Sequence, residues 1–413
     1  MEHTPEEEER INAVLRYLEG DRQVDIYRSL GRSKFWLNKW RDRYKTGRKD
    51  WYKDLPKSAT VIPHKTSEQI EQVVVNLRKA LMDGTEDATK YSCVGAEAIQ
   101  FHMEGLSYKP ADIPSISTIK RIIKRNKMTV NKPERYKRIH SKGRHTILNP
   151  KLINELHQMD FVGPRHIPGY GPINSLHLKD VVGRQVAGMQ YNEKSMDNVM
   201  AFLLDYWKES PIPKYLQVDN GMCFVGDYKH PKSFSRFVRF VLYAGVEVVF
   251  IAPSKPWMNG TIEEFNKGFD VRFWTKERFT DLADMRKKSP MFFEKENKFN
   301  AWKLRNETLN AVEPKRMLRA DFTVGMNRFP LAAGKVHFIR EVDSLGEISV
   351  LNEYFDVGKE YIGEYVWTTI ETLKQTLRVY YKDKKLKVLE IKNFSYVIEE
   401  NVHKRDDSIF RLG

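Results

Sequence analysis

Three acidic residues, far apart in the chain, stand at or beside the predicted ends of strands and helices. Asp160 lies within an apolar run that precedes a strand-like segment, and Asp219 ends a short β-type run at an Asp-Asn-Gly turn. The third acid is Glu263 or Glu264, in the first turn of a helix predicted after the apolar run 246–252. Clustered carboxylates repel each other unless cations neutralise them, and hard oxygen ligands suit Mg²⁺ or Mn²⁺. The three stretches together predict a site for divalent ions.

Each stretch taken alone has a simpler interpretation. The segment 256–266 also fits an ordinary strand–loop–helix with solvated acids, because short motifs are weak signals. Periodicity does not choose between Glu263 and Glu264, which stand about 100° apart on a helix. The apolar stripe formed by Ile262, Phe265 and Phe269 lies almost midway between them. The choice between the two glutamates therefore stays open on physical grounds.

The ordered set Asp160, Asp219-Asn-Gly and Asn259-Gly-Thr-Ile-Glu-Glu-Phe-Asn266 resembles the D-D-E catalytic core of insertion-sequence transposases and retroviral integrases. The resemblance covers roughly residues 155–275. In that superfamily the last motif reads Asn-Gly-x-x-Glu-x-x-Asn, which implies Glu263 as the third acid. Asp160, Asp219 and Glu263 would then be the catalytic and metal-binding residues, holding two Mg²⁺ or Mn²⁺ ions in each active site.

One departure from the superfamily pattern is the distance between the second and third acids. Asp219 and Glu263 lie 44 positions apart, which is longer than usual in the superfamily. The polar segment 226–233 is the predicted place of the extra length, as a surface loop. Lys267, one turn beyond Glu263, is a candidate contact to a DNA phosphate, with an ordinary surface lysine as the alternative.

The resemblance implies a DNA transposase or integrase. Such an enzyme cleaves the ends of a mobile element and joins the 3′-hydroxyl to target DNA by two-metal-ion transesterification. Its partners would be double-stranded DNA, as terminal inverted repeats and as target, and further copies of the chain in a dimer or larger assembly. Two alternatives remain open. One is a domesticated, sequence-specific DNA-binding protein with an inactive core, and the other is a ribonuclease H-like nuclease.

The composition of the 413-residue chain agrees with a DNA partner. Lys and Arg number 70 against 55 Asp and Glu, a net charge of +15, which favours a polyanionic ligand. The two cysteines fit a reducing compartment and exclude a disulfide framework and a His/Cys zinc module. The chain has no apolar run of membrane-spanning length and its acidic start lacks a signal-peptide pattern. We therefore expect a cytoplasmic, nucleoid-associated protein without a membrane partner.

Two helical units are predicted ahead of the core. Residues 1–60 read as a helix-turn-helix in which Ser33 caps the last helix, and residues 61–130 read as a second helix-turn-helix ending in a helix capped by Ser115. A plain helical hairpin with a solvated basic face is the alternative for the first unit. The candidate DNA contacts on these two final helices are Lys34, Asn38, Lys39, Arg41, Lys120, Arg121 and Lys124.

The remaining chain completes a multidomain prediction. Residues 131–150 form a basic linker suited to phosphate contacts, and 151–275 an α/β ribonuclease H-like integrase core. A helical extension over 276–328 follows. Residues 329–413 contain short, alternating, β-branched strands that predict a small antiparallel β-barrel. Such a barrel would contact DNA or another subunit, or act only as a stability module.

Overall fold

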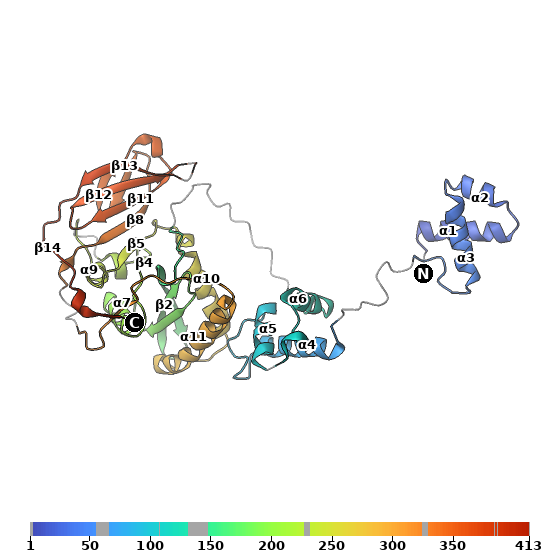
Figure 1. Ribbon diagram of the computed structural model, residues 1–413, viewed down its shortest axis with the longest axis horizontal. Helices are drawn as coiled ribbons and strands as arrows, with labels where there is room; N and C mark the ends of the chain where they lie inside the picture. Colours follow the sequence, from blue (N-terminus) through green and yellow to red (C-terminus); the bar gives the residue numbers. More distant parts are fainter. Residues whose placement is uncertain are drawn as a thin grey trace. The chain divides into compact units, whose positions relative to one another are not determined.

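The protein is described by a computed structural model, in which two compact units, Met1–Ser67 and Glu68–Gly413, are distinguished (Figure 1). The described residues are 3–54, 66–106, 108–130, 148–226, 232–323, 329–383, 385 and 387–412. Most of the predicted basic linker and of the predicted loop insertion lies outside these residues. None of the described helices is both long and apolar enough to cross a membrane.

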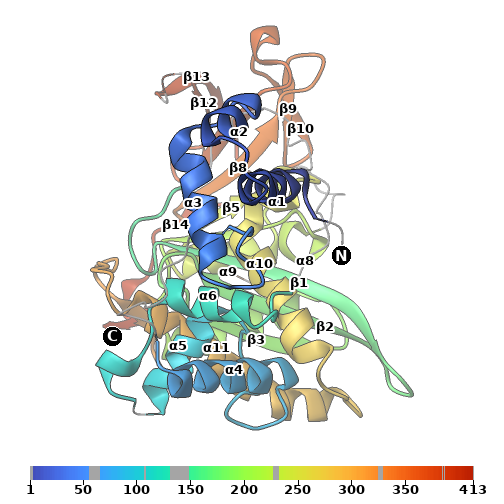
Figure 2. The same ribbon diagram turned by 90° about the vertical axis from the view of Figure 1, so that its right-hand side faces the viewer.

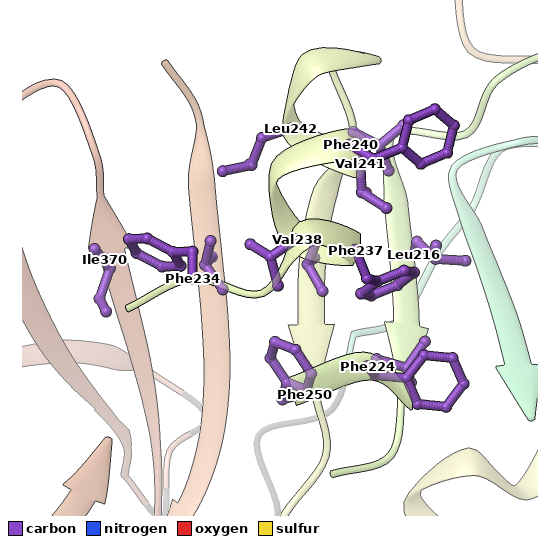
Figure 3. Close-up of a cluster of buried hydrophobic side chains, with 14 of the residues drawn as sticks. Leu216, Phe224, Phe234, Phe237, Val238, Phe240, Val241, Leu242, Phe250 and Ile370 are labelled. Carbon is purple, nitrogen blue, oxygen red and sulfur yellow. The ribbon is translucent and has the colours of Figure 1, made fainter. Parts of the chain in front are cut away.

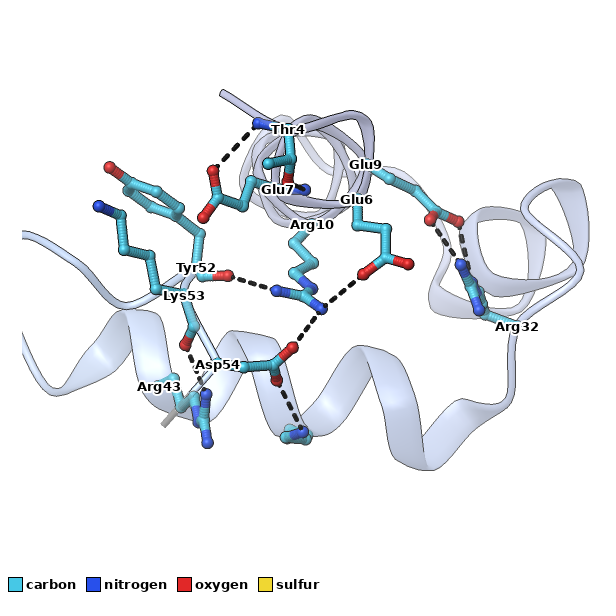
Figure 4. Close-up of polar contacts among 11 residues, drawn as sticks. Thr4, Glu6, Glu7, Glu9, Arg10, Arg32, Arg43, Tyr52, Lys53 and Asp54 are labelled. Carbon is cyan, nitrogen blue, oxygen red and sulfur yellow. Dashed lines mark hydrogen bonds and ion pairs between the residues drawn. The ribbon is translucent and has the colours of Figure 1, made fainter. Parts of the chain in front are cut away.

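The first unit consists of three helices, α1 (Pro5–Leu18), α2 (Gln23–Ser29) and α3 (Lys34–Lys45). Their apolar faces meet at Ala13, Ile26 and Leu37. The predicted cap is confirmed, since the Ser33 hydroxyl accepts a hydrogen bond from the Trp36 amide. Arg10 of α1 holds the segment after α3, through 2.9 and 2.8 Å bonds to the Tyr52 carbonyl and the Asp54 carboxylate (Figure 4).

A second helical group begins the larger unit, with α4 (Glu68–Asp83), α5 (Ala96–Gly105), the short η1 (Pro110–Asp112) and α6 (Ile116–Arg125). The cap at Ser115 is confirmed by its bond from the Thr118 amide. These helices bury their apolar faces in one cluster, which also contains Phe299 of the long helix α11 (Leu282–Leu304) (Figure 2). The group is therefore packed against the core.

The region predicted as a ribonuclease H-like core forms a mixed sheet flanked by helices. Strands β1 (Leu156–Ile167), β2 (Gly171–Asp180) and β3 (Val186–Tyr191) are antiparallel neighbours. After α7 (Met196–Glu209), strand β4 (Tyr215–Val218) pairs parallel to β1. After α8 (Met222–Val225) and α9 (Arg236–Tyr243), β5 (Glu247–Phe250) pairs parallel to β4. The short β-type run predicted before the turn at Asp219 is confirmed as β4.

Two helical layers cover this sheet, because neighbouring residues of a strand point to opposite faces. Met159 and Phe161 of β1 pack in the cluster that contains α7 and α9. Gln158 and Asp160 instead bond to residues of α10 (Gly260–Phe269). The short η2 (Pro256–Asn259) leads into α10, which continues into the π-helical η3 (Asp270–Trp274) and packs with α11.

The predicted helical extension over 276–328 is wrong beyond Leu304. Residues 305–323, which follow α11, are not helical and include strand β6 (Arg316–Leu318), which pairs with β15 (Phe410–Leu412). Pro314 explains part of the difference, because proline lacks an amide hydrogen and restricts the preceding residue. The last strand of the chain therefore returns to the region beside α7.

The C-terminal strands extend the core sheet. Strand β8 (Lys335–Glu341) pairs parallel to β5, and β11 (Tyr365–Glu371), β12 (Thr376–Lys382) and β13 (Val388–Ser395) follow as antiparallel neighbours, which gives nine strands. The smaller elements are β7 (Leu331–Ala332), β9 (Glu347–Val350), β10 (Glu353–Asp356), η4 (Lys359–Tyr361), β14 (Val402–His403) and η5 (Asp407–Ile409). The predicted barrel is not confirmed, because the described strands form an open extension.

Shared apolar burial explains this continuity. Phe338 of β8 stacks on Phe250 of β5 with ring centroids 5.2 Å apart. The same buried cluster runs from Leu216 and Phe237 in the core to Ile370 of β11 (Figure 3). Because the C-terminal strands share the apolar cluster of the core, they do not enclose a separate apolar interior as the strands of a barrel do.

We therefore expect core and C-terminal strands to unfold together. Phe338→Ala should lower the free energy of unfolding by about 3–5 kcal/mol, since it leaves a cavity beside Phe250. Leu389→Ala on β13, where the side chain is 43% exposed, should change it by less than about 0.5 kcal/mol. Urea unfolding of residues 66–413, followed by tryptophan fluorescence and by circular dichroism, tests this. Two well-separated transitions for core and strands would contradict it.

Candidate active site

Neighbouring strands place the first two acids at one level of the sheet. Gln158 of β1 lies opposite Gln217 of β4 in the parallel pairing. Asp160 and Asp219 each lie two residues further along the chain, so the two acids stand side by side. The β1–β2 register sets Asp160 opposite His177. The two aspartates are 59 residues apart in the sequence, and the pairing of β1 with β4 brings them together.

Neutral amides fasten the start of α10 over these strands. Gln217 donates through Nε2 to the Met258 carbonyl at 2.9 Å and to Asn259 Oδ1 at 3.1 Å. Gln158 Oε1 accepts from the Ile262 amide at 3.0 Å. Asn259 Nδ2 completes the contact with a long 3.4 Å bond to the Met159 carbonyl. The first turn of α10, which carries Glu263, is thereby held on β1 and β4.

A buried relay orients Asp160. Asn266 donates through Nδ2 to Asp160 Oδ2 at 2.9 Å, and its Oδ1 lies 2.8 Å from His177 Nδ1. Since Oδ1 can only accept, Nδ1 of His177 carries the hydrogen. Burial lowers the pKa of His177 to about 4, so the ring is neutral. Gly188 leaves room for this ring, because a β-carbon there would lie 2.6 Å from His177 Cδ2.

The turn that carries Asp219 is supported from the C-terminal strands. Asp219 Oδ1 accepts a 2.8 Å bond from the Gly221 amide. Asn220 donates to the Ile251 carbonyl at 2.6 Å and accepts from Arg340 Nη2 of β8 at 3.1 Å. A hollow of about 390 Å³ opens beside this turn, lined by residues 219–221 and 251–256. The site therefore has an open approach next to Asp219.

The charges of Asp219 and Glu263 are close enough to act on Asp160. Burial and then the charge of Asp219 raise the pKa of Asp160 to about 7, and Glu263 adds to this rise. In the described part of the chain, no ion pair involves Asp160, Asp219 or Glu263. The charge of the exposed Lys194 lowers the pKa of Asp160, but this effect is smaller than the rise caused by burial and by Asp219. Among the described residues, no group of three or more His, Cys, Asp or Glu side chains is arranged so that it could hold a metal ion.

Other polar groups near the site have different roles. The charge of Glu264, which is exposed, acts on Lys179, whereas that of Glu263 acts on Asp160. Burial raises the pKa of the Cys223 thiol to about 12, so this thiol is protonated at neutral pH. His157 is fully buried and lies 3.2 Å from Asn154 Oδ1, so it packs in the interior.

The candidate DNA contacts of the first unit lie on α3. Lys34 and Lys39 are exposed, and Lys39 Nζ lies 4.6 Å from the Trp40 ring and 3.9 Å from Asp54. Arg41 pairs with Asp42 at 3.0 Å, which reduces its availability. Asn38 is half-buried, with its Oδ1 atom fully covered and without a hydrogen-bond partner in the described part.

The other candidate contacts lie in the larger unit. Lys120, Arg121 and Lys124 are exposed on α6, whose opposite side buries Ile119 and Ile122. Lys267 is exposed on α10 and lines a cavity of about 320 Å³ that includes residues 81–84 and 89–94.

Sequence reasoning missed the residues that hold the acids in place. These are Gln158, His177, Gln217 and Arg340, together with Lys194 beside Asp160. A polar residue in the middle of an apolar strand was an available signal, since buried polar groups need partners. The partner of each could not be predicted from the sequence, because it lies on a distant segment.

The raised pKa of Asp160 predicts a pH-dependent cost in folding. In the metal-free protein, the folded state holds this proton up to about pH 7 and the unfolded chain only to 3.8. Stability should therefore fall as the pH rises from about 4 to 7, by on the order of 2–4 kcal/mol. Asp160→Asn should be more stable than the parent at pH 8 and show little difference at pH 4.

Urea unfolding in EDTA at both pH values measures this difference. Glu264→Gln, which changes an exposed acid of the same helix, serves as the control and should shift stability by less than about 0.5 kcal/mol. An Asp160→Asn protein that is less stable than the parent at pH 8 would contradict the assignment of a buried carboxyl whose pKa is raised.

The N-terminus matches a known family, and solved structures are similar over larger parts of the chain. Residues 4–51 match the family model of the homeodomain-like domain. No curated protein matches the chain in sequence. The cryo-electron microscopy structure of a simian T-cell lymphotropic virus intasome with the PP2A regulatory subunit B56 gamma is similar at 10% identity and a TM-score of 0.30, over 73% of this chain and 99% of that chain.

Two retroviral integrase catalytic core domains are also similar. That of BIV has 16% identity and a TM-score of 0.25, over 38% of this chain and 86% of that one. That of HTLV-2, solved in complex with magnesium, has 15% identity and a TM-score of 0.26, over 38% and 90%. With its ordered acids, its strand order and its homeodomain-like unit, the chain resembles the superfamily of DDE transposases and integrases.

Proposed function

We propose that the protein is a DNA transposase or integrase that cuts at the ends of a mobile element and joins the 3′-hydroxyl to target DNA. One observation carries the proposal: Asp160, Asp219 and Glu263 come from three ordered motifs, and the charges of the last two act on Asp160, with no ion pair to any of the three in the described residues. A carboxyl that is buried near two uncompensated carboxylates is costly unless a cation or a reacting group uses it.

The donor set fits divalent ions of the Mg²⁺ type. All three side chains offer hard oxygen atoms, and the pKa of Asp160 is raised by its burial and then by the charges of Asp219 and Glu263. Two such ions, when bound, would activate the attacking hydroxyl or water and stabilise the leaving oxygen. Asp160, Asp219 and Glu263 would hold them.

The protein's own groups fix the geometry and leave the carboxylates free to bind. Asn266 engages one oxygen of Asp160, and the Gly221 amide engages one oxygen of Asp219. Each joining step breaks one phosphodiester bond and forms another, with the 3′-oxygen attacking phosphorus, so it needs no external energy source. The protonated Cys223 thiol is unsuited to act as a covalent nucleophile.

DNA recognition belongs to the helical units in this proposal. The homeodomain-like unit would place α3 in the major groove, where Lys34 and Lys39 contact phosphates or bases. The exposed basic residues of α6 and Lys267 of α10 would add contacts nearer to the site. Because two element ends must be processed, the working assembly would hold at least two copies of the chain.

The metal mechanism predicts a difference between the two adjacent glutamates. With Mg²⁺ or Mn²⁺, the protein should nick and join the DNA that flanks its coding region, and EDTA should abolish both steps. Glu263→Gln should lower both by at least about 10³-fold while leaving DNA binding intact, because loss of a metal ligand removes transition-state stabilisation. Glu264→Gln, with the same change in charge, should keep substantial activity.

Gel assays of nicking and strand transfer, with gel-shift measurements of binding, distinguish these outcomes. Equal loss in the two variants would show that Glu263 is misassigned. Cutting that continues in excess EDTA would falsify the metal mechanism.

Phosphate contacts by α3 predict a salt dependence. Lys34→Ala and Lys39→Ala should each reduce the slope of log K against log salt by about 0.9, the value for one lost phosphate contact. Arg22→Ala on α2 removes a charge that already pairs with Asp25 at 2.8 Å, and should leave the slope nearly unchanged. Fluorescence anisotropy over 50–200 mM salt, a range of about fourfold, measures this. Unchanged slopes for both lysine variants would show that DNA does not bind at α3 but at another part of the protein.

A further inference from the structure

A buried tyrosine is one of the contacts that fasten the second helical group to the core. Tyr91 lies in the connector between α4 and α5, yet its side chain is only 5% exposed and belongs to the apolar cluster of α10, η3 and α11. Its ring lies 5.2 Å from that of Phe273, and its hydroxyl donates to Glu277 at 2.8 Å. The backbone has a φ of 63°, which a bulky side chain rarely adopts. Insertion of this ring is therefore favoured enough to offset an unfavourable backbone.

Charged groups surround the inserted ring on both sides. Arg272 of η3 donates to the Tyr91 carbonyl at 3.1 Å and pairs with Glu296 of α11 at 2.7 Å. Lys90 pairs with Glu277, the partner of the tyrosine hydroxyl, at 2.6 Å. Both ion pairs are largely covered, so their geometry is better defined than that of a surface pair. The connector is consequently held along its backbone as well as by its side chain.

A second contact joins α5 and α6 to the same core helix. Phe101 of α5 lies 5.5 Å from Phe299 of α11, and Trp302 Nε1 donates to Glu104 at 2.6 Å. Phe299 also belongs to the cluster that buries Ile119 and Ile122 of α6. The helix that exposes Lys120, Arg121 and Lys124 is thus fixed to α11 through its buried face.

The helical stretch that receives Tyr91 also carries the third acid. Helix α10 continues directly into η3, so Glu263 stands near the start of the stretch and Arg272 and Phe273 near its end. A rigid helix transmits a shift at one end to the other. The contact at Tyr91 therefore bears on both the basic face of α6 and the position of Glu263.

We propose that Tyr91 is a positioning residue that sets the distance between the basic face of α6 and the active site. Resting on the proposed function, this means that Tyr91 fixes where a DNA strand is cut relative to the sequence that is bound. Without the tyrosine ring, DNA bound by α6 would no longer be presented to Glu263 at one defined spacing.

Distance measurements test the docking without any need for activity. Spin labels at Ser117→Cys on α6 and Glu264→Cys on α10, in the full chain with Cys93→Ser and Cys223→Ser, report the spacing by pulsed electron paramagnetic resonance. We expect one narrow distance distribution, unchanged in Tyr91→Phe, which keeps the ring, and broadened in Tyr91→Ala. Tyr396→Ala removes another tyrosine that is nearly fully buried, with 1% exposure, and should leave the distribution narrow.

Mapping of the cut site at base resolution tests the functional part, with the native cysteines and Glu264 restored. Tyr91→Ala should bind DNA like the parent but lose about 100-fold at the principal position, with cuts spread over neighbouring positions, because a misplacement of about 1 Å can have that effect. Tyr91→Phe and Tyr396→Ala should cut at the parent position.

The outcomes separate this inference from the proposed function. A narrow distribution in Tyr91→Ala overturns the docking role, whether or not the protein cuts DNA. A broadened distribution with an unchanged cut position overturns the spacing role alone. If the parent fails to cut with Mg²⁺ or Mn²⁺, the proposed function and the cut-site role fail together, while the distance measurement still decides the docking.

Discussion

The largely buried carboxyl of Asp160, close to the charges of Asp219 and Glu263, is the constraint on which the core depends. Mutual repulsion and burial oppose this arrangement, and their effect is visible in the raised pKa of Asp160. The arrangement therefore requires a scaffold whose own stability exceeds the cost. That scaffold is a sheet covered on both faces, with Met159 and Phe161 buried on one side and α10 bonded to Gln158 on the other.

Neutral amides make the direct contacts around Asp160 and the start of α10. Asn266 bonds to Asp160, Asn259 and Gln217 bond to each other, and Gln158 bonds to the start of α10. An arginine or lysine in their place would neutralise the charge of Asp160. An amide fixes geometry and leaves that charge available. This accounts for the asparagine at each end of the segment 259–266, around a glutamate that itself makes no ion pair in the described part.

The sequence predicted local elements well, because their signals are local. Ser33 and Ser115 cap the helices that they were expected to cap, and the strand ending before Asp219 lies where its apolar run predicts. The position of β8 beside β5 could not be predicted in this way. Its alternating pattern fits a barrel as well as a sheet edge, and the decision depends on Phe250, about ninety residues earlier in the chain.

The prediction of the site was limited for the same reason, because the residues that contact the acids lie on segments far away in the sequence. Asp160, Asp219 and Glu263 could be nominated from ordered motifs, whereas His177 gave no sign of its link to Asn266. Tyr91 is a sharper case, since a tyrosine in a connector is ordinarily assigned to the surface. Its burial follows only from the cluster of phenylalanines on α10, η3 and α11, which has no local signature.

These long-range contacts give the core three supports that lie outside its own strands. Arg340 of the C-terminal strands bonds to Asn220 in the turn of Asp219. Tyr91 of the second helical group packs at the end of the helical stretch that begins with Glu263. Asn266, within that stretch, bonds to Asp160. Asp219 is thus supported from the C-terminal strands, whereas Asp160 and Glu263 depend on the same helical stretch, so that a displacement of α10 reaches both of them. The geometry of the three acids therefore depends on segments that lie far from them in the sequence.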